Sequence, residues 1–299
     1  MRDRPRIPAA RTGWSDGGTG WAWDAPDVAT PLLVLAAGFC AAVGSVGGLG
    51  GALLLVPLLV ATGTPAAEAA PLGLVLVASG SLAGGSRHLE DRSVNHRLGV
   101  TVEVAASTGA VIGALLSGVV SETVLVYALA VVALVAAAAG GSRKGIRNAP
   151  HPAFGPEHVG ERMGMVGGAV ARVGGVAPYR PRRLPLGLAA MSVAGLVSGL
   201  SGVGGGFIKT PVMSEIMYVP VKVAAATSTF TVGITAAVGL LVFAAQGRIE
   251  VHPAAAVIIG SVVGGLAGAR LQNRLRGPSV RKVIALILIL VAVMLVATA

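Results

Sequence analysis

Charged residues are scarce in this chain of 299 residues, at 12% of the sequence. An ordinary soluble domain carries about 25% charged residues, so the scarcity argues against that class. Cys40 is the single cysteine and lies in an apolar run, which excludes an intramolecular disulfide and indicates a small packed residue. The histidines lie in predicted loops or at the ends of apolar runs, so the sequence predicts no metal site and no cofactor. They are His88, His96, His151, His158 and His252.

Hydrophobic residues make up 54% of the chain, which also has 44 glycines and a mean hydropathy of +0.79. This composition is typical of a membrane protein, in which glycine lets helix backbones approach closely. The formal net charge of +10 could suggest a nucleic-acid partner. However, the basic residues lie between apolar runs rather than along one amphipathic face, so they indicate membrane topology and no nucleic acid.

Apolar runs long enough to cross a bilayer, which takes about 20 residues, occur eight times. They cover 30–60, 66–86, 98–120, 123–140, 185–212, 221–245, 252–271 and 280–298. The first and fifth runs are too long for one straight span, and each contains a glycine cluster followed by a proline. We therefore predict that both helices break within the membrane.

These two clusters match each other. Gly47-Gly48-Leu49-Gly50-Gly51 precedes Pro57, and Gly202-Val203-Gly204-Gly205-Gly206 precedes Pro211. An offset of 154 residues places Gly48, Gly50, Gly51 and Pro57 on Gly202, Gly204, Gly205 and Pro211. An offset of 155 then pairs Pro65 with Pro220 and Gly109 with Gly264. The sequence thus predicts an all-α, polytopic membrane protein of about eight transmembrane helices in two tandem halves.

The predicted organisation has four parts. A polar tail over 1–27 is expected to be disordered and is not a cleaved signal, because it lacks an apolar core. The first four-helix repeat covers 28–140, a basic linker covers 141–184, and the second repeat covers 185–299.

Positive charge predicts which segments face the cytoplasm. The linker, the loop 87–97 and the tail are all rich in arginine, so we place them there, with four crossings in each half. This arrangement puts the basic loop 271–282 outside, against the rule. If the two broken segments were re-entrant hairpins instead, each half would cross an odd number of times and the repeats would be inverted. Both arrangements stay open.

The paired clusters, the run Ala225-Ala226-Thr227-Ser228 at the start of a helix and the turn Gly247-Arg248-Ile249 together resemble the sulfite exporter TauE/SafE family, which includes 4-toluene sulfonate uptake permease-like transporters. The resemblance covers about residues 30–299. It implies a multi-pass transporter of the cytoplasmic (inner) membrane that exports sulfite, organosulfonates or related small anions. The first half departs from the pattern with Leu72-Gly73 where the second half has Thr227-Ser228.

A helix interrupted in the bilayer exposes unpaired N–H groups and a partial positive charge at the start of its second part, which suits an oxyanion. The predicted substrate-binding residues are backbone glycines of both clusters with hydroxyls and one lysine of the second half. They are Gly48, Gly50, Gly51, Ser201, Gly202, Gly204, Gly205, Gly206, Lys209, Thr227, Ser228 and Thr229. The alternative is close helix packing, which we favour for the pairs Gly109/Gly113 and Gly264/Gly268.

Ionisable residues inside membrane spans are costly and usually functional. Lys209 could supply a fixed cation for the substrate, or its ammonium could extend to the membrane interface. Glu103 could carry a proton for coupled transport, or it could be an interfacial acid paired with Arg97. Sodium is an equal candidate for the coupling ion.

Two other functions compete with a transporter. A passive anion channel would not need a degenerate two-fold repeat, although the sequence does not decide against it. Gly199-Leu200-Ser201-Gly202 resembles the motif of rhomboid intramembrane proteases, which also need a histidine within a span. No histidine lies within a later predicted span, because His252 stands at a boundary just before Pro253, so an enzyme is the least favoured function.

Overall fold

The computed structural model describes residues 26–47, 50–90, 92–141, 156–170 and 175–272, together with Ile289 and Val293. Its helices are α1 (Pro26–Gly47), α2 (Ala52–Ala61), α3 (Ala66–Glu90), α4 (His96–Leu116), α5 (Glu122–Gly141), α6 (Leu184–Ser201), α7 (Gly206–Pro211), the π-helical η3 (Val212–Ile216), α8 (Val221–Ala245) and α9 (Val251–Gln272). Five of them, α3, α4, α6, α8 and α9, are long and apolar enough to cross a membrane. The first seven predicted runs fall on described helices, whereas 280–298 lies outside the described residues apart from Ile289 and Val293.

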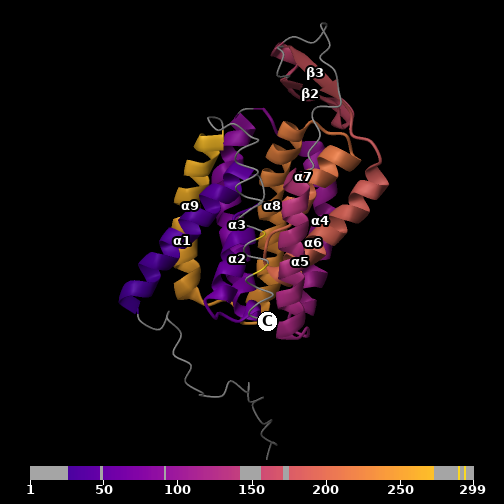
Figure 1. Cartoon of the computed structure of the whole chain (residues 1–299). Helices are drawn as coiled ribbons and strands as arrows, with labels where there is room; N and C mark the ends of the chain where they lie inside the picture. The colour runs from indigo at the N-terminus through magenta and orange to yellow at the C-terminus, as the bar shows by residue number, and fades with distance from the viewer. Residues whose placement is uncertain are drawn as a thin grey trace, which may run out of the picture.

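The helices form a bundle with α3 and α8 at its centre (Figure 1). α1 and α9 lie side by side on one flank, and α4 and α6 lie side by side on the other. Helix α5 packs beside α3, α6 and α7. The sequence offset maps α1 onto α6 and α4 onto α9, so the contact between α1 and α9 in one flank corresponds to the contact between α6 and α4 in the other.

Glycines make the contact between α4 and α6 close. A Cβ atom on Gly109 would collide with the carbonyl of Ser192, and one on Gly113 would collide with the carbonyl of Leu196. The residue numbers of the contacting positions increase together along the two helices, so α4 and α6 run in the same direction.

The contact between α1 and α9 uses the corresponding glycines. A Cβ atom on Gly264 would collide with Gly38, and one on Gly268 would collide with Ala42. These two helices also run in the same direction. The packing interpretation of both glycine pairs is therefore confirmed.

The central helices α3 and α8 run in opposite directions. Gly84, late in α3, lies against Thr229, early in α8. Gly239, late in α8, lies against Leu74, early in α3. Gly80 and Gly84 of α3 lie near Ala41 and Ser45 of α1, so α1 runs with α3. Helix α4 runs with α8, because Gly99 lies against Thr227 and Thr231 while Glu103, one turn later, contacts Thr235.

Helices α1, α3 and α9 thus run one way, and α4, α6 and α8 run the other way. Helices that match under the sequence offset have opposite directions, which is the inverted arrangement. The expectation of four crossings in each half is wrong, because the chain reverses at each glycine cluster. The short α2 must return from the break to the start of α3, since only residues 62–65 join them. Likewise α7 and η3 return to the start of α8.

The reversal after α6 depends on glycine backbone geometry. Gly202 ends the helix in the left-handed conformation, with φ of 72°, and its N–H group donates to the carbonyl of Ser198. Gly204 is also left-handed, at 65°, and Gly50 in the first cluster has φ of 80°. Side chains other than glycine rarely adopt these angles, so the clusters can turn the chain where an ordinary helix would continue.

The inverted arrangement accounts for Arg270, which directly precedes the basic loop that the four-crossing scheme placed outside; residues 273–282 of that loop lie outside the described residues. Arg270, in the last turn of α9, lies at the same end of the bundle as the 92–97 loop and residues 156–183, which we call the linker face. Near the opposite face, Arg248 is the one lysine or arginine in the described ranges. The start of α1 belongs to that opposite face, where Thr30 hydrogen-bonds His252 at 3.3 Å. The prediction that the chain ahead of α1 shares a side with the linker therefore disagrees with the described start of α1.

The linker also contains structure that the all-α prediction missed. Strands β1 (Gly160–Glu161), β2 (Gly167–Val170) and β3 (Val176–Tyr179) form an antiparallel sheet in the order β1-β2-β3. Two short 3₁₀ turns accompany it, η1 (Pro156–His158) and η2 (Met163–Met165). The strands are two to four residues long and rich in glycine, so they carry little alternation for a sequence pattern to reveal.

This sheet attaches to the start of α4. Glu161 accepts hydrogen bonds from the N–H groups of His96 and Arg97 and forms an ion pair with the Arg97 guanidinium at 3.2 Å. Asn95 caps α4 through its side-chain oxygen and donates to the Tyr179 hydroxyl at 3.1 Å. Burial raises the pKa of Tyr179 to about 12, so this hydroxyl stays protonated at neutral pH. Arg97 is thus held by Glu161 on the surface and is not the partner of Glu103.

Candidate functional site

The two glycine breaks meet in the centre of the bundle. A Cβ atom on Gly50 would lie 3.7 Å from the carbonyl oxygen of Gly204, and both glycines face Val77 of α3. Gly73, also on α3, lies against the carbonyl of Gly202. Residues 154 positions apart in the chain therefore form one junction.

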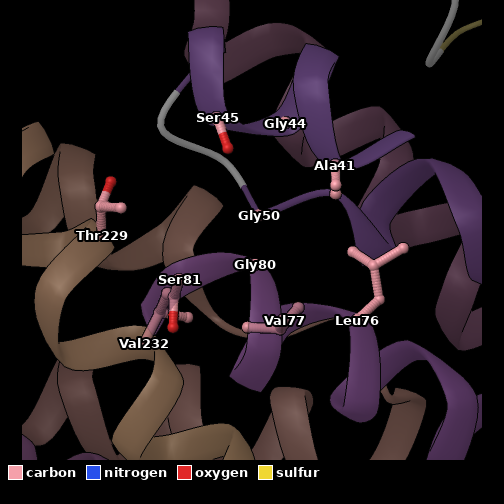
Figure 2. Close-up of a pocket in the computed structure, with 11 residues that line it drawn as sticks. Ala41, Gly44, Ser45, Gly50, Leu76, Val77, Gly80, Ser81, Thr229 and Val232 are labelled. Atoms are coloured by element: carbon pink, nitrogen blue, oxygen red, sulfur yellow. The ribbon is translucent and has the colours of Figure 1, made fainter. Parts of the chain in front are cut away.

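A small pocket lies beside this junction, between α1, α3 and α8 (Figure 2). Its volume is about 20 Å³ and its walls include Gly50 and Gly51 of the first break. Hydroxyl groups reach it from three helices: Ser45 from α1, Ser81 from α3 and Thr229 from α8 (Figure 2). The sequence predicted Gly50, Gly51 and Thr229 as site residues, and the pocket brings these three together.

The pocket is small, and two of its hydroxyl groups are hydrogen-bonded within their own helices. Thr229 donates to the carbonyl of Ala225 at 3.0 Å, and Ser81 donates to the carbonyl of Ala78 at 3.2 Å, so both turn lone pairs rather than hydrogens toward free space. A space of roughly 10–15 Å³ holds one water molecule. A sulfur oxyanion would need the pocket to widen and the hydroxyls to rotate toward it.

The polar side chains of the second half lie on the other side of the junction. Lys209, one turn into α7, is fully buried and its Nζ lies 2.6 Å from Oε2 of Glu103 on α4. Thr235 of α8 accepts a hydrogen bond from Lys209 and donates one to Glu103. Ser107 donates to the Glu103 carboxylate at 3.1 Å. Lys209 therefore does not extend to an interface, and Glu103 is neither interfacial nor paired with Arg97.

The remaining predicted site residues make helix-internal or inter-helix contacts. Ser201 donates to the carbonyl of Val197 at 2.6 Å, and Ser228 donates to the carbonyl of Gly206 at 3.4 Å. Thr227 accepts the N–H group of Asn95 at 3.0 Å, at the start of α4. Gly205 lies against the carbonyl of Ala194. Gly48 lies outside the described residues.

Sequence reasoning missed several polar residues around the junction. Thr227, Thr231 and Thr235 follow each other at intervals of four residues on an apolar helix, a stripe that could have revealed Thr235. Ser198 of α6 is fully buried and its hydroxyl has no hydrogen-bond partner in the described structure. Ser45 and Ser81 have no pattern in the sequence that separates them from ordinary helix serines.

The paired helix breaks, the inverted order of the helices and the buried polar cluster together describe a polytopic membrane protein. The profile of the sulfite exporter TauE/SafE family matches residues 33–295, which is most of the chain. The chain belongs to this family. The resemblance suggested by the glycine clusters is thereby confirmed, and with it the multi-pass membrane class.

One curated relative is the probable membrane transporter protein YunE of Bacillus subtilis (strain 168). It is 30% identical to this family member over 111 residues, which cover 37% of the chain and 41% of the relative. The match thus spans less than half the length of either protein. No solved structure matches the chain significantly.

Proposed function

We propose that the protein is a secondary transporter of small anions, with sulfite, organosulfonates and related sulfur-containing anions as substrates. Export across the cytoplasmic membrane is the direction we propose. The family membership supports a membrane transport role. The chemistry of the junction is the reason for choosing an anion.

The convergence of two helix starts at the junction of the breaks carries this proposal. Helix α2 begins after Gly51 and α7 begins after Gly205, and neither has a side-chain cap. Both run away from the contact between Gly50 and Gly204. The start of a helix carries a partial positive charge, so the two starts favour an anion between them. The hydroxyls of Ser45, Ser81 and Thr229 would complete its coordination from the pocket.

We further propose that residues 28–140 and 185–299 are two inverted copies of one unit, joined by the linker over 141–184. The matched contacts of α1 with α9 and of α6 with α4 support this reading. Most described basic residues outside the bundle centre lie at the linker face, so we place that face in the cytoplasm. Inverted copies suit alternating access, in which one copy rocks against the other around a fixed site.

Uptake of labelled sulfite and methanesulfonate into proteoliposomes containing the purified protein tests the proposed function. We expect saturable flux, and accumulation against the anion gradient when a pH or sodium gradient is applied. Accumulation would rule out a passive channel, because a channel only dissipates a gradient. Absence of flux for both anions, with no thermal stabilisation by sulfate, thiosulfate or sulfoacetate, would contradict the proposal.

Replacement of Ser201 separates a transporter from a protease. The Ser201 hydroxyl donates to its own helix, an arrangement that supplies no general base. We expect Ser201→Ala to retain at least partial flux. Complete loss of function with unchanged thermal stability would favour catalysis by Ser201.

A further inference from the structure

The buried ion pair between Glu103 and Lys209 has properties that a packing role does not require. The Lys209 side chain is fully buried and that of Glu103 is 7% exposed. Three polar groups converge on the Glu103 carboxylate: Lys209, Thr235 and Ser107. Apolar residues of the same volume would stabilise a membrane bundle at least as well, because both charges must leave water.

The offset between the halves connects this pair to the pocket. Thr235 corresponds to Gly80, which lines the pocket in the first half, and Ser198 corresponds to Gly44, which also lines it. Thr235 hydrogen-bonds both Glu103 and Lys209, so this pair lies next to the residues of the second half that correspond to the walls of the pocket. The Ser198 hydroxyl is buried there without a partner, on the stretch of α6 that contacts Gly205. A buried hydroxyl without a partner is rare, and a bound water or ion is one of the groups that would satisfy it.

The Lys209 ammonium also has a third N–H group for which no hydrogen bond is described. An ammonium group has three N–H bonds, and Glu103 and Thr235 accept two of them in the described structure. A small anion could accept the third from the side of the Gly204–Gly205 break. With both charges of the pair present, however, that anion would leave one uncompensated negative charge buried in the bundle.

We propose that Glu103 is the internal counter-anion of Lys209, and that a substrate anion binds at Lys209 only when Glu103 takes up a proton. This inference rests on the proposed transport function and adds its coupling ion. In the empty site the carboxylate neutralises the ammonium. In the loaded site the substrate neutralises it, and the protonated carboxyl remains hydrogen-bonded among Ser107 and Thr235. About one proton is then taken up with each monovalent anion, as linkage requires.

Lys209 is the ionisable group that faces Glu103 from the elements packed around it. Helix α6 has no ionisable side chain. The others on these elements lie toward the linker face: His96 and Arg97 begin α4, Lys222 begins α8, and Glu215 belongs to η3. The pH dependence of anion binding should consequently follow the Glu103 carboxyl. When one proton is taken up with each anion, apparent affinity should fall about tenfold for each pH unit that the medium becomes more alkaline.

Methanesulfonate is a suitable probe, because it stays fully ionised and carries no proton itself. We would measure its binding to the full-length protein in detergent between pH 5 and 8, together with proton uptake reported by a pH dye in weak buffer. The wild type should take up about one proton per bound anion, with the tenfold slope at the alkaline end. Glu103→Gln should bind methanesulfonate with a nearly flat pH profile and no proton uptake. The matched control Glu250→Gln removes an exposed carboxylate at the opposite face and should behave as the wild type does.

The double variant Glu103→Gln/Lys209→Met guards against a folding defect, because it buries no unpaired charge. It should fold and lose methanesulfonate binding at least tenfold at every pH. Wild-type binding and flux without proton uptake, or an unchanged pH profile in Glu103→Gln, would overturn the coupling while leaving the transport function intact. Retained affinity in the double variant would overturn the role of Lys209. Absence of wild-type binding and flux for both methanesulfonate and sulfite would instead contradict the proposed function and the coupling with it.

Discussion

The two helix breaks share features of their described backbone and differ in their side-chain chemistry. Both reverse the chain at left-handed glycines, and both lead into a short returning helix with a glycine N-cap. After the first break the return helix carries Leu55, and after the second it carries Lys209 at the matching position. The backbone therefore builds the junction symmetrically, whereas a buried charge pair exists on one side. The difference suggests that access to the junction depends on both halves and that ionic selectivity depends on the second.

The largest expected effect concerns the direction of the two halves. In a Cys40→Ala background, single cysteines at Arg180, Gln246 and Arg270 should react with a membrane-impermeant maleimide from two different sides. The inverted arrangement places Arg180 and Arg270 together and Gln246 opposite. A parallel arrangement would instead place Gln246 with Arg180, and labelling in that pattern would overturn the inversion. The readout is labelling in intact cells compared with inside-out vesicles.

Removal of one charge from the buried pair should have the next largest effect. Lys209→Met leaves the Glu103 carboxylate unpaired, which should lower the free energy of unfolding by about 3–5 kcal/mol. Glu103→Gln in the same chain should restore most of the loss. The matched change Leu55→Met in the first half should cost less than about 1.5 kcal/mol. Denaturation in detergent followed by circular dichroism measures all three. An equal loss of unfolding free energy in Lys209→Met and Leu55→Met would contradict the proposed difference between the two breaks.

Substitution in the two flanking contacts tests whether the backbone is as symmetric as the glycine contacts indicate. Gly109→Ala and Gly264→Ala each place a Cβ atom against a carbonyl of the neighbouring helix. Each should destabilise the protein by about 1–3 kcal/mol. Gly118→Ala is the control, because its Cβ would meet no atom closer than 3.8 Å. A large effect in one flank alone, measured as the thermal midpoint in detergent, would show that the flanks are not equivalent.

The smallest effects separate two threonines of α8. Thr227 accepts a hydrogen bond from the Asn95 backbone, so Thr227→Val should cost about 1 kcal/mol of stability and leave anion affinity unchanged. Thr229 lines the pocket, so Thr229→Val should instead weaken sulfite flux several-fold, by about 0.5–1.5 kcal/mol of binding. Thermal midpoints and initial flux rates at several sulfite concentrations distinguish the two. The opposite assignment of effects would move the site away from the pocket.

Local patterns predicted the helices well because each depends mainly on its own residues. Apolar runs located the described spans, and the glycine clusters located both breaks. The substrate residues were predicted less completely. Glycines of both clusters and Thr229 do meet at the junction, but Thr227 is occupied by Asn95 and Ser201 by its own helix. Whether a hydroxyl is free depends on the neighbouring helix, and no pattern within one helix contains that information.

The linker sheet was missed for a related reason. Its strands are held by hydrogen bonds to each other and by Glu161, Asn95 and Tyr179 at the start of α4. Such short strands have no periodicity of their own, so their formation depends on a surface provided by another part of the chain.

The sequence by itself determined the membrane class, the family and the positions of the breaks, because hydrophobic length and glycine spacing act locally along the chain. Tertiary structure decided the opposite directions of the helices that match under the sequence offset and the pairing of Glu103 with Lys209. Glu103 and Lys209 are 106 residues apart, and each had a plausible local role at an interface. Only the parallel packing of α4 on α8, with α7 folded back against them, brings the two charges together, and in a low-dielectric interior each charge requires the other.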